Sequence, residues 1–182
     1  MSRSILVSLV AVVLATPLSG QTGAQSAAAV ILTATDIKAA IAATDSTPVI
    51  DRVLRLVPIG NEYNVSVSVV RRRLVGGETP PDALSHAEIT EVYQILEGRA
   101  VIVTGGRLVD SRTLDPAGAV VRNLIGPSSR GTSILNGVSR AVGPGDVVVI
   151  PPGTAHGFLE IQSDEVRYLV VRVDPHRAIQ PR

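Results

Sequence analysis

The segment that decides the fold runs from Gly145 to Phe158 and reads GDVVVIPPGTAHGF. Its first half is rich in valine, and β-branched residues favour a strand. Two prolines and a glycine then predict a turn, because proline cannot continue the hydrogen-bond ladder of a sheet and glycine accepts the backbone angles of turns. His156 stands just after that turn, before a further apolar run. The segment therefore predicts two strands joined by a turn that aims His156.

A second unusual segment lies earlier in the chain and reads SHAEITEVYQILEG, from Ser85 to Gly98. Of the three histidines, one lies in each of these two segments, and the third, His176, lies in the polar C-terminal tail, where we expect it to be exposed. Glu91 to Leu96 and Ala100 to Thr104 are expected to form a strand pair broken at Glu97-Gly98. Only a fold that joins distant strands can bring the two segments together.

Together the two segments resemble the paired motifs of the cupin superfamily. The first motif has the form G-x5-H-x-H-x(3,4)-E-x6-G, and the second has the form G-x5-P-x-G-x2-H-x3-N. The resemblance covers about residues 60–173, and it implies a cupin-type double-stranded β-helix, which is a jelly-roll barrel. The residues that match at the motif spacings are His86, Glu91, Gly98, Gly145, Pro151, Gly153 and His156.

The chain also departs from these motifs. Leu84 stands where the first motif has its first histidine, and the preceding glycine, Gly77, lies one residue further away than the motif asks. Glu160 replaces the final asparagine of the second motif. The resemblance therefore implies a metal centre of two histidines and one glutamate rather than three histidines and one glutamate.

The implied ligands of that centre are His86, Glu91 and His156. Two imidazoles and one carboxylate suffice to hold one divalent transition metal (zinc, iron, manganese or nickel) and leave positions for water or substrate. Glu88 lies two residues from His86 and is an alternative fourth ligand. A barrel that lost its metal together with the missing histidine is the other interpretation.

Three side chains are candidate acid or base groups: Glu88, Tyr93 and Glu160. Tyr93 follows Glu91 by two residues and shares its face on a regular strand, although core packing explains it equally well. These groups favour a small-molecule enzyme of the oxygenase, lyase or isomerase type. The alternative is a non-catalytic barrel that binds or senses a small ligand, because the fold alone does not determine function.

The chain divides into four parts. Residues 1–24 have the basic start and short apolar run of a signal peptide, which predicts a periplasmic or secreted protein without an integral membrane span after processing. Residues 25–60 are predicted as a leader with a short helix, capped by Asp36, and the first strand. Residues 61–173 form the all-β barrel, since turn signals recur every eight to twelve residues, and residues 174–182 form a fraying tail.

Composition limits the partners of the protein. Aliphatic residues dominate the 45% hydrophobic content, and the net charge is +1. No strong field therefore attracts nucleic acid, and we expect a small molecule as the ligand. Long aliphatic strands have edges that need cover, which predicts a homodimer.

Overall fold

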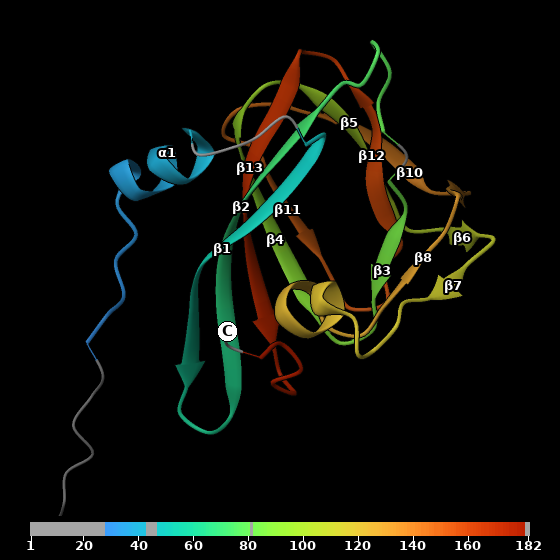
Figure 1. Ribbon diagram of the computed structural model, residues 1–182. Coiled ribbons are helices and arrows are strands. Elements are labelled where there is room, and N and C mark those ends of the chain that lie inside the picture. The colour runs from blue at the N-terminus through green and yellow to red at the C-terminus, as the bar shows by residue number, and fades with distance from the viewer. Residues whose placement is uncertain (1–27, 43–46, 81, 181–182) are drawn as a thin grey trace, which may run out of the picture.

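The computed structural model describes residues 28–42, 47–80 and 82–180, and it shows two antiparallel sheets that face each other as a barrel (Figure 1). The predicted signal peptide, residues 1–24, lies outside the described residues. One sheet has the strand order β1 (Val49–Ile59), β2 (Tyr63–Arg73), β13 (Glu165–Asp174), β4 (Thr90–Glu97), β11 (Val147–Ile150). The facing sheet has the order β10 (Val138–Val142), β5 (Ala100–Thr104), β12 (His156–Ile161), β3 (Leu84–His86), β8 (Ser128–Arg130), β7 (Arg112–Thr113).

Four smaller elements complete the described chain. The helix α1 (Ala34–Ala42) packs on the outside of the five-stranded sheet, and β6 (Arg107–Val109) pairs with β9 (Ser133–Leu135). The π-helix η1 (Val121–Ile125) lies between the two sheets at one end of the barrel (Figure 1). Among the residues that the structure describes, no helix has the length and apolar character needed to span a membrane.

The chain passes back and forth between the two sheets. Strands β3, β4 and β5 lie in alternate sheets, and so do β10 to β13. This is the double-stranded β-helix that the motifs predicted, and the all-β fold class is confirmed. One detail was wrong: β4 and β5 do not pair with each other, because the tight turn at Gly98 sends the chain from one sheet to the other.

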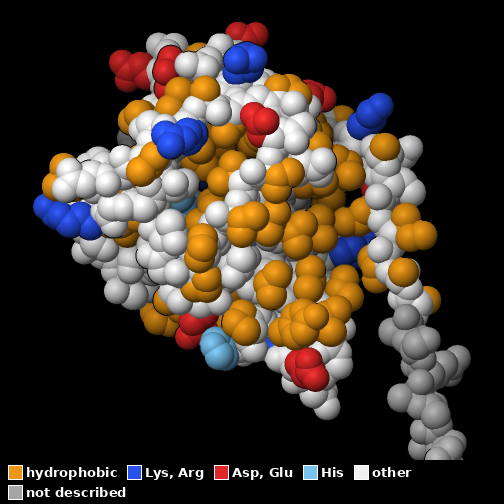
Figure 2. All heavy atoms as spheres, turned by 180° about the vertical axis from the view of Figure 1, so that it is seen from behind, with side chains coloured by type: hydrophobic (Ala, Val, Ile, Leu, Met, Phe, Trp, Pro, Cys, Tyr) orange, Lys and Arg blue, Asp and Glu red, His pale blue; other side chains and the backbone are white. Residues whose placement is uncertain are grey.

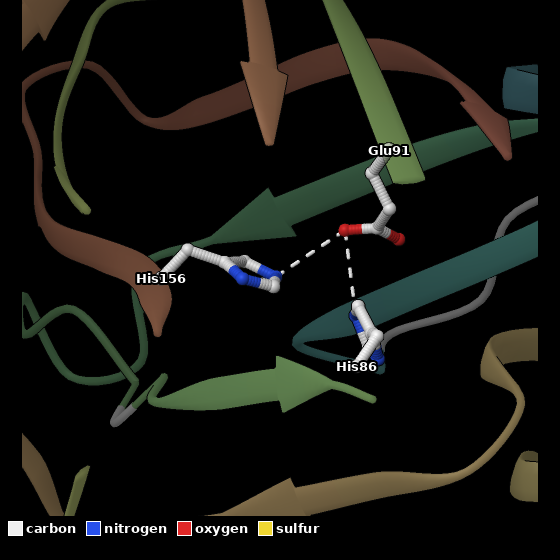
Figure 3. Close-up of side chains that lie close together, drawn as sticks. All are labelled: His86, Glu91 and His156. Carbon is white, nitrogen blue, oxygen red and sulfur yellow. Dashed lines mark ion pairs between the residues drawn. The ribbon is translucent and has the colours of Figure 1, made fainter. Parts of the chain in front are cut away.

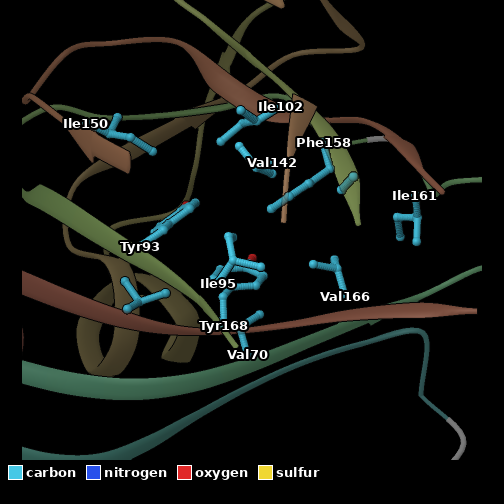
Figure 4. Close-up of a cluster of buried hydrophobic side chains, with 12 residues drawn as sticks. Val70, Tyr93, Ile95, Ile102, Val142, Ile150, Phe158, Ile161, Val166 and Tyr168 are labelled. Atoms are coloured by element: carbon cyan, nitrogen blue, oxygen red, sulfur yellow. The ribbon is translucent and has the colours of Figure 1, made fainter. Parts of the chain in front are cut away.

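The interior of the barrel has an apolar half and a polar half. The apolar half contains most of the few aromatic side chains, which pack against aliphatic residues of both sheets (Figure 4). Close-packed apolar side chains of this kind supply most of the stability of a barrel. Its members are Val70, Tyr93, Ile95, Ala100, Ile102, Val142, Ile150, Phe158, Ile161, Val166, Tyr168 and Val170.

The polar half is built partly by β2, whose alternation is reversed relative to an ordinary barrel strand. Asn64, Ser66 and Ser68 point inward and are almost fully buried, whereas Val65 and Val67 between them point outward and are only half-buried. A period of two shows that a segment is a strand, but it does not say which face is inside. In β2 the polar face is inside, because it lines the half of the barrel that holds the charged residues.

Three local expectations need correction. The N-cap of α1 is Thr33 rather than Asp36: the Thr33 hydroxyl accepts from the Asp36 N–H, and the Asp36 carboxylate accepts from the Thr33 N–H, which is a capping box. The glycine, proline and serine residues of the segment 126–131 predict a loop, but this segment contains β8. The start of the tail does not fray, because the buried Asp174 carboxylate accepts hydrogen bonds from the backbone of Ala178 and Ile179.

Two motif glycines allow a matched test of the turns. Gly98 and Gly145 both have positive φ, +81° and +93°, but a Cβ on Gly98 would overlap the Glu165 carbonyl, whereas a Cβ on Gly145 meets no atom within 4 Å. Gly145→Ala should cost about 1–2 kcal/mol of unfolding free energy from the backbone conformation alone. Gly98→Ala should cost roughly 1–3 kcal/mol more, because the backbone must also move. Urea unfolding measures both, and equal losses would contradict the packing role of Gly98.

Candidate metal centre

The two histidines and the glutamate predicted as ligands lie together in the polar half of the barrel (Figure 3). The Oε2 atom of Glu91 lies 3.4 Å from Nε2 of His86 and 3.2 Å from Nε2 of His156. All three side chains are buried, with exposed fractions of 3% or less. The structure thus brings the three predicted ligands to one point.

Each ligand comes from the end of a strand. His86 ends β3 and His156 begins β12, two neighbouring strands of the six-stranded sheet, while Glu91 reaches across from β4 in the facing sheet. Leu84, at the position of the missing family histidine, is the register partner of His156. The site therefore depends on how the two sheets face each other.

Hydrogen bonds fix the state of both imidazoles. Nδ1 of His156 lies 2.9 Å from the Thr154 carbonyl, which can only accept, so Nδ1 carries the proton. Nδ1 of His86 lies 2.8 Å from the Ser128 hydroxyl, which donates its own proton to the Gly126 carbonyl, so His86 Nδ1 is again the donor. In the neutral ring of each, Nε2 keeps its lone pair and points it at Glu91.

The carboxylate of Glu91 is also held from two sides. Nε of Arg172 donates to Oε1 at 2.8 Å, and the Tyr93 hydroxyl donates to Oε2 at 2.8 Å. Burial alone would raise the pKa of Glu91, but its contacts with His156 and His86 and the charge of Arg172 outweigh burial and hold the pKa well below its usual range. Burial and the charge of Glu91 raise the pKa of Tyr93 well above its usual range, so Tyr93 stays protonated.

Arg172 is in turn fixed by other strands. Its guanidinium donates to the Ser68 hydroxyl at 3.0 Å and to both carboxylate oxygens of Asp51, the nearer at 2.5 Å. Burial alone would lower the pKa of Arg172, but Asp51 and Glu91 raise it above its ordinary value. The buried positive charge is therefore balanced by one carboxylate on each side.

The residues present fit a divalent metal. Nε2 of His156 is buried and, despite its short distance to Glu91, makes no hydrogen bond, which leaves a lone pair without a partner. Buried polar atoms rarely stay unsatisfied. Ligand atoms at about 2.0–2.1 Å from one tetrahedral ion lie roughly 3.4 Å apart, and the two distances to Oε2 match that spacing.

The other candidate residues lie in different surroundings. Tyr93 lies in the site through its bond to Glu91. Glu88 is half-buried outside the three-residue group, and Glu160 is exposed and accepts a hydrogen bond from Gln162. Their roles as acid or base groups, and that of Glu88 as a fourth ligand, stay predictions. His176 is exposed, as expected.

Sequence reasoning missed the residues that support the ligands. Ser128 falls in a segment predicted as a loop, and Asp51 shows no signal in the sequence. Arg172 does carry a signal, because it occupies the inward phase of a strand whose other inward residues include Val166, Tyr168 and Val170. An arginine at such a position indicates a buried partner of opposite charge.

A cleft of about 580 Å³ lies beside the site. One wall is the edge strand β1, and the other consists of η1 and the C-terminal segment. Asp51 lines the cleft and bonds Arg172, which bonds Glu91. The lining residues are Ile50, Asp51, Arg52, Val53, Leu54, Arg55, Leu56, Asn123, Leu124, Ile179 and Gln180.

Comparison with known proteins finds similarity only to solved structures. No protein-family model matches the sequence, and no curated protein matches it significantly. A Bacillus halodurans protein, BH2720, is 12% identical with a TM-score of 0.46, covering 83% of each chain. An uncharacterised Klebsiella pneumoniae protein with a double-stranded β-helix domain is 16% identical with a TM-score of 0.46, covering 74% of this chain and 84% of its own.

A third structure, the DMSP lyase DddQ from Ruegeria pomeroyi, is 19% identical with a TM-score of 0.36, covering 62% of this chain and 39% of its own. Likenesses this distant carry no argument about activity. The strand order of the chain itself defines a double-stranded β-helix with a buried His-Glu-His group between its sheets. That fold is the fold of the cupin superfamily, as the two motifs predicted.

Arg172 offers a test of how the ligand carboxylate is positioned. Arg172→Lys keeps the charge but loses the Nε bond to Glu91 and the paired bonds to Asp51. We expect the zinc affinity to fall about 10–100-fold, as is usual when a partner of a ligand is lost. Competition with a chromophoric chelator measures this, and Arg167→Lys, an outward position on the same strand, is the control. Equal affinities in wild type and Arg172→Lys would contradict the positioning role.

The melting temperature of the metal-free protein should fall as the pH rises, and bound metal should reverse the direction of this dependence. Burial alone would lower the pKa of His156, but its contact with Glu91 raises it above the ordinary 6.5. The resulting stability is fully present below the unfolded pKa and is lost as the pH rises through the raised folded pKa. Metal-free protein should therefore melt at a lower temperature near pH 8.5 than near pH 6.

The reversal follows because protons compete with the metal for Nε2, so metal affinity rises with pH. His156→Gln should remove its part of the pH dependence from the metal-free protein. Identical pH profiles for wild type and His156→Gln in melting experiments would show that this contact does not stabilise the fold.

Proposed function

We propose that this protein is an exported cupin that binds one divalent transition metal through His86, Glu91 and His156 and acts on a small molecule. The observation that carries the proposal is the convergence of two imidazole Nε2 atoms and one carboxylate oxygen on one buried point. A metal held there would supply Lewis-acid polarisation of a substrate oxygen or activation of water or dioxygen. Such chemistry corresponds to an oxygenase, a lyase or an isomerase.

Arg172 and Tyr93 orient the carboxylate of Glu91. Arg172 occupies Oε1 of Glu91 and leaves Oε2 to face the two histidines. Tyr93 holds a proton on its phenol oxygen at hydrogen-bond distance from that same Oε2. The cleft beside β1 is the proposed route for a small molecule, because one guanidinium group separates its Asp51 wall from Glu91.

A second candidate function is non-catalytic binding or sensing of a small ligand. The burial of the three predicted ligands favours it, since each is exposed by 3% or less and none of them lines the cleft. In this case the metal would be structural, or the cleft alone would bind the ligand.

Metal analysis of protein purified from a periplasmic fraction tests the proposal. Wild type should carry about one metal per chain, and His86→Ala and His156→Ala should each carry none while their circular dichroism stays that of a folded β-protein. His176→Ala, at the exposed histidine, is the matched control and should keep its metal. Full occupancy in both site variants would refute the ligand assignment.

The identity of the metal then separates the chemical classes. A nitrogen and oxygen site filled outside the cytoplasm follows the Irving–Williams order, so zinc is expected in the purified protein. Zinc does not support redox chemistry, so dioxygen uptake with enediol or thiol substrates should appear only after anaerobic loading with ferrous iron. Uptake by iron-loaded wild type, absent in His86→Ala, would support the oxygenase class. Turnover by the zinc protein would support a lyase or isomerase.

A further inference from the structure

The outer face of the five-stranded sheet carries a continuous group of valines. Where β2 and β13 place Ser66, Ser68 and Arg172 inward, the valines that alternate with these residues point outward, and neighbouring strands continue the pattern. Cross-strand register joins Val67, Val171, Val92 and Val149 into one row across four strands. We call the group the valine face, and its members are Val57, Val65, Val67, Val92, Val147, Val149, Val171 and Val173.

Within the described residues, one end of this sheet face is covered by the helix α1. The helix α1 packs over Val69, Leu96 and Leu169, while the valine face beside it stays half-buried or exposed, with Val147 and Val149 exposed by 59% and 62%. Figure 2 views the molecule from behind and shows hydrophobic side chains gathered over the middle of this view, beside the segment that leads into α1. Contiguous apolar surface of this kind marks an interaction site.

We propose that the valine face packs against the valine face of a second copy of this chain, so that the protein is a face-to-face homodimer. Two aliphatic sheets stack about 10 Å apart with nearly aligned strands, as in a β-sandwich. A flat row of valines without a charge at its centre is complementary to itself, which a two-fold interface requires.

The charges at the rim agree with this arrangement. β13 is the central strand of the five, so a two-fold axis parallel to it places β1 of one copy over β11 of the other. Arg52 lies in the cross-strand row that ends at Val147, and Asp146 directly precedes Val147. The exposed Arg52 at the rim of one copy would therefore lie opposite Val147 and the exposed Asp146 of the other.

The flat sheet face supplies about half of the area that a standard interface buries per partner. Five strands spaced about 4.8 Å apart, over roughly 17 Å of strand length, present about 400 Å² of flat face. A standard interface buries about 800 Å² per partner. Side-chain relief, the outer side of α1 and the exposed Val30 and Ile31 just before it supply further area on the same side.

The sheet edges are less suited to pairing than the face. The edge strand β1 has a bulge between Val53 and Arg55 and contains Pro58, and the edge strand β11 is only four residues long and runs into Pro151 and Pro152. Bulges, prolines and short edge strands are features that prevent edge-to-edge association. The homodimer predicted from the need to cover strand edges is therefore proposed to form through the valine face.

Sedimentation equilibrium of the full mature protein tests the proposal. Wild type should be a dimer at micromolar concentration, and Val149→Lys should raise the dimer dissociation constant at least 10-fold. Leu159→Lys is the matched control, since Leu159 is 63% exposed but lies on the six-stranded sheet. A monomeric wild type at about 100 µM, or an equal effect of both lysines, would overturn the proposal. Thermal melting confirms that each variant is folded.

Spin labels distinguish the face from the edges. The chain has no cysteine, so Val171→Cys and Leu159→Cys each carry one label. Face-to-face packing brings the two labels at position 171 to within about 25 Å, given sheets about 10 Å apart, and leaves those at position 159 beyond about 30 Å. A dimer with the shorter distance at position 159 would overturn the proposed interface.

Discussion

Glu91 is a charged carboxylate with 1% of its surface exposed, and most of the polar interior exists to balance it. An isolated buried charge costs several kcal/mol, so it persists only when paired and hydrogen-bonded. Arg172 provides the opposite charge from the register-paired position on β13, and Asp51 balances the excess. The residues Glu91, Arg172, Ser68 and Asp51 come from four neighbouring strands, so the site and the five-stranded sheet stabilise each other.

The same constraint explains the outer surface. A barrel that fills half its interior with serine, asparagine and arginine leaves the valines of those strands on the outside. The surface hydrophobicity is thus the counterpart of the polar interior, because successive residues of a strand point to opposite faces. In one half of the barrel the apolar side chains point inward. In the other half the polar side chains point inward and the valines lie on the outer surface.

Most of the fold and the ligand set could be predicted from the sequence, because motif spacing and period-two alternation are local signals. The resemblance to the cupin motifs implied His86, Glu91 and His156 as ligands, and the structure brings these three residues together. The supporting contacts could not be predicted, because Ser128 and Asp51 acquire their roles from strand pairing across long sequence distances. The sequence also could not show which face of β2 points into the barrel, because a period-two alternation fits either orientation. The cap of α1 was placed three residues late because both Thr33 and Asp36 are good cap residues, and only geometry distinguishes a cap from its N3 partner.

The inward serines of β2 have a further consequence for the folding of the chain. A slip of one residue would turn Val65 and Val67 inward and Ser66 and Ser68 outward, which is the arrangement that hydrophobic burial alone prefers. Native pairing must therefore be selected against a competing register, and the guanidinium of Arg172 distinguishes the two, because it finds Ser68 in only one of them. This part of the sheet is locally frustrated, and electrostatics rather than apolar packing selects its register.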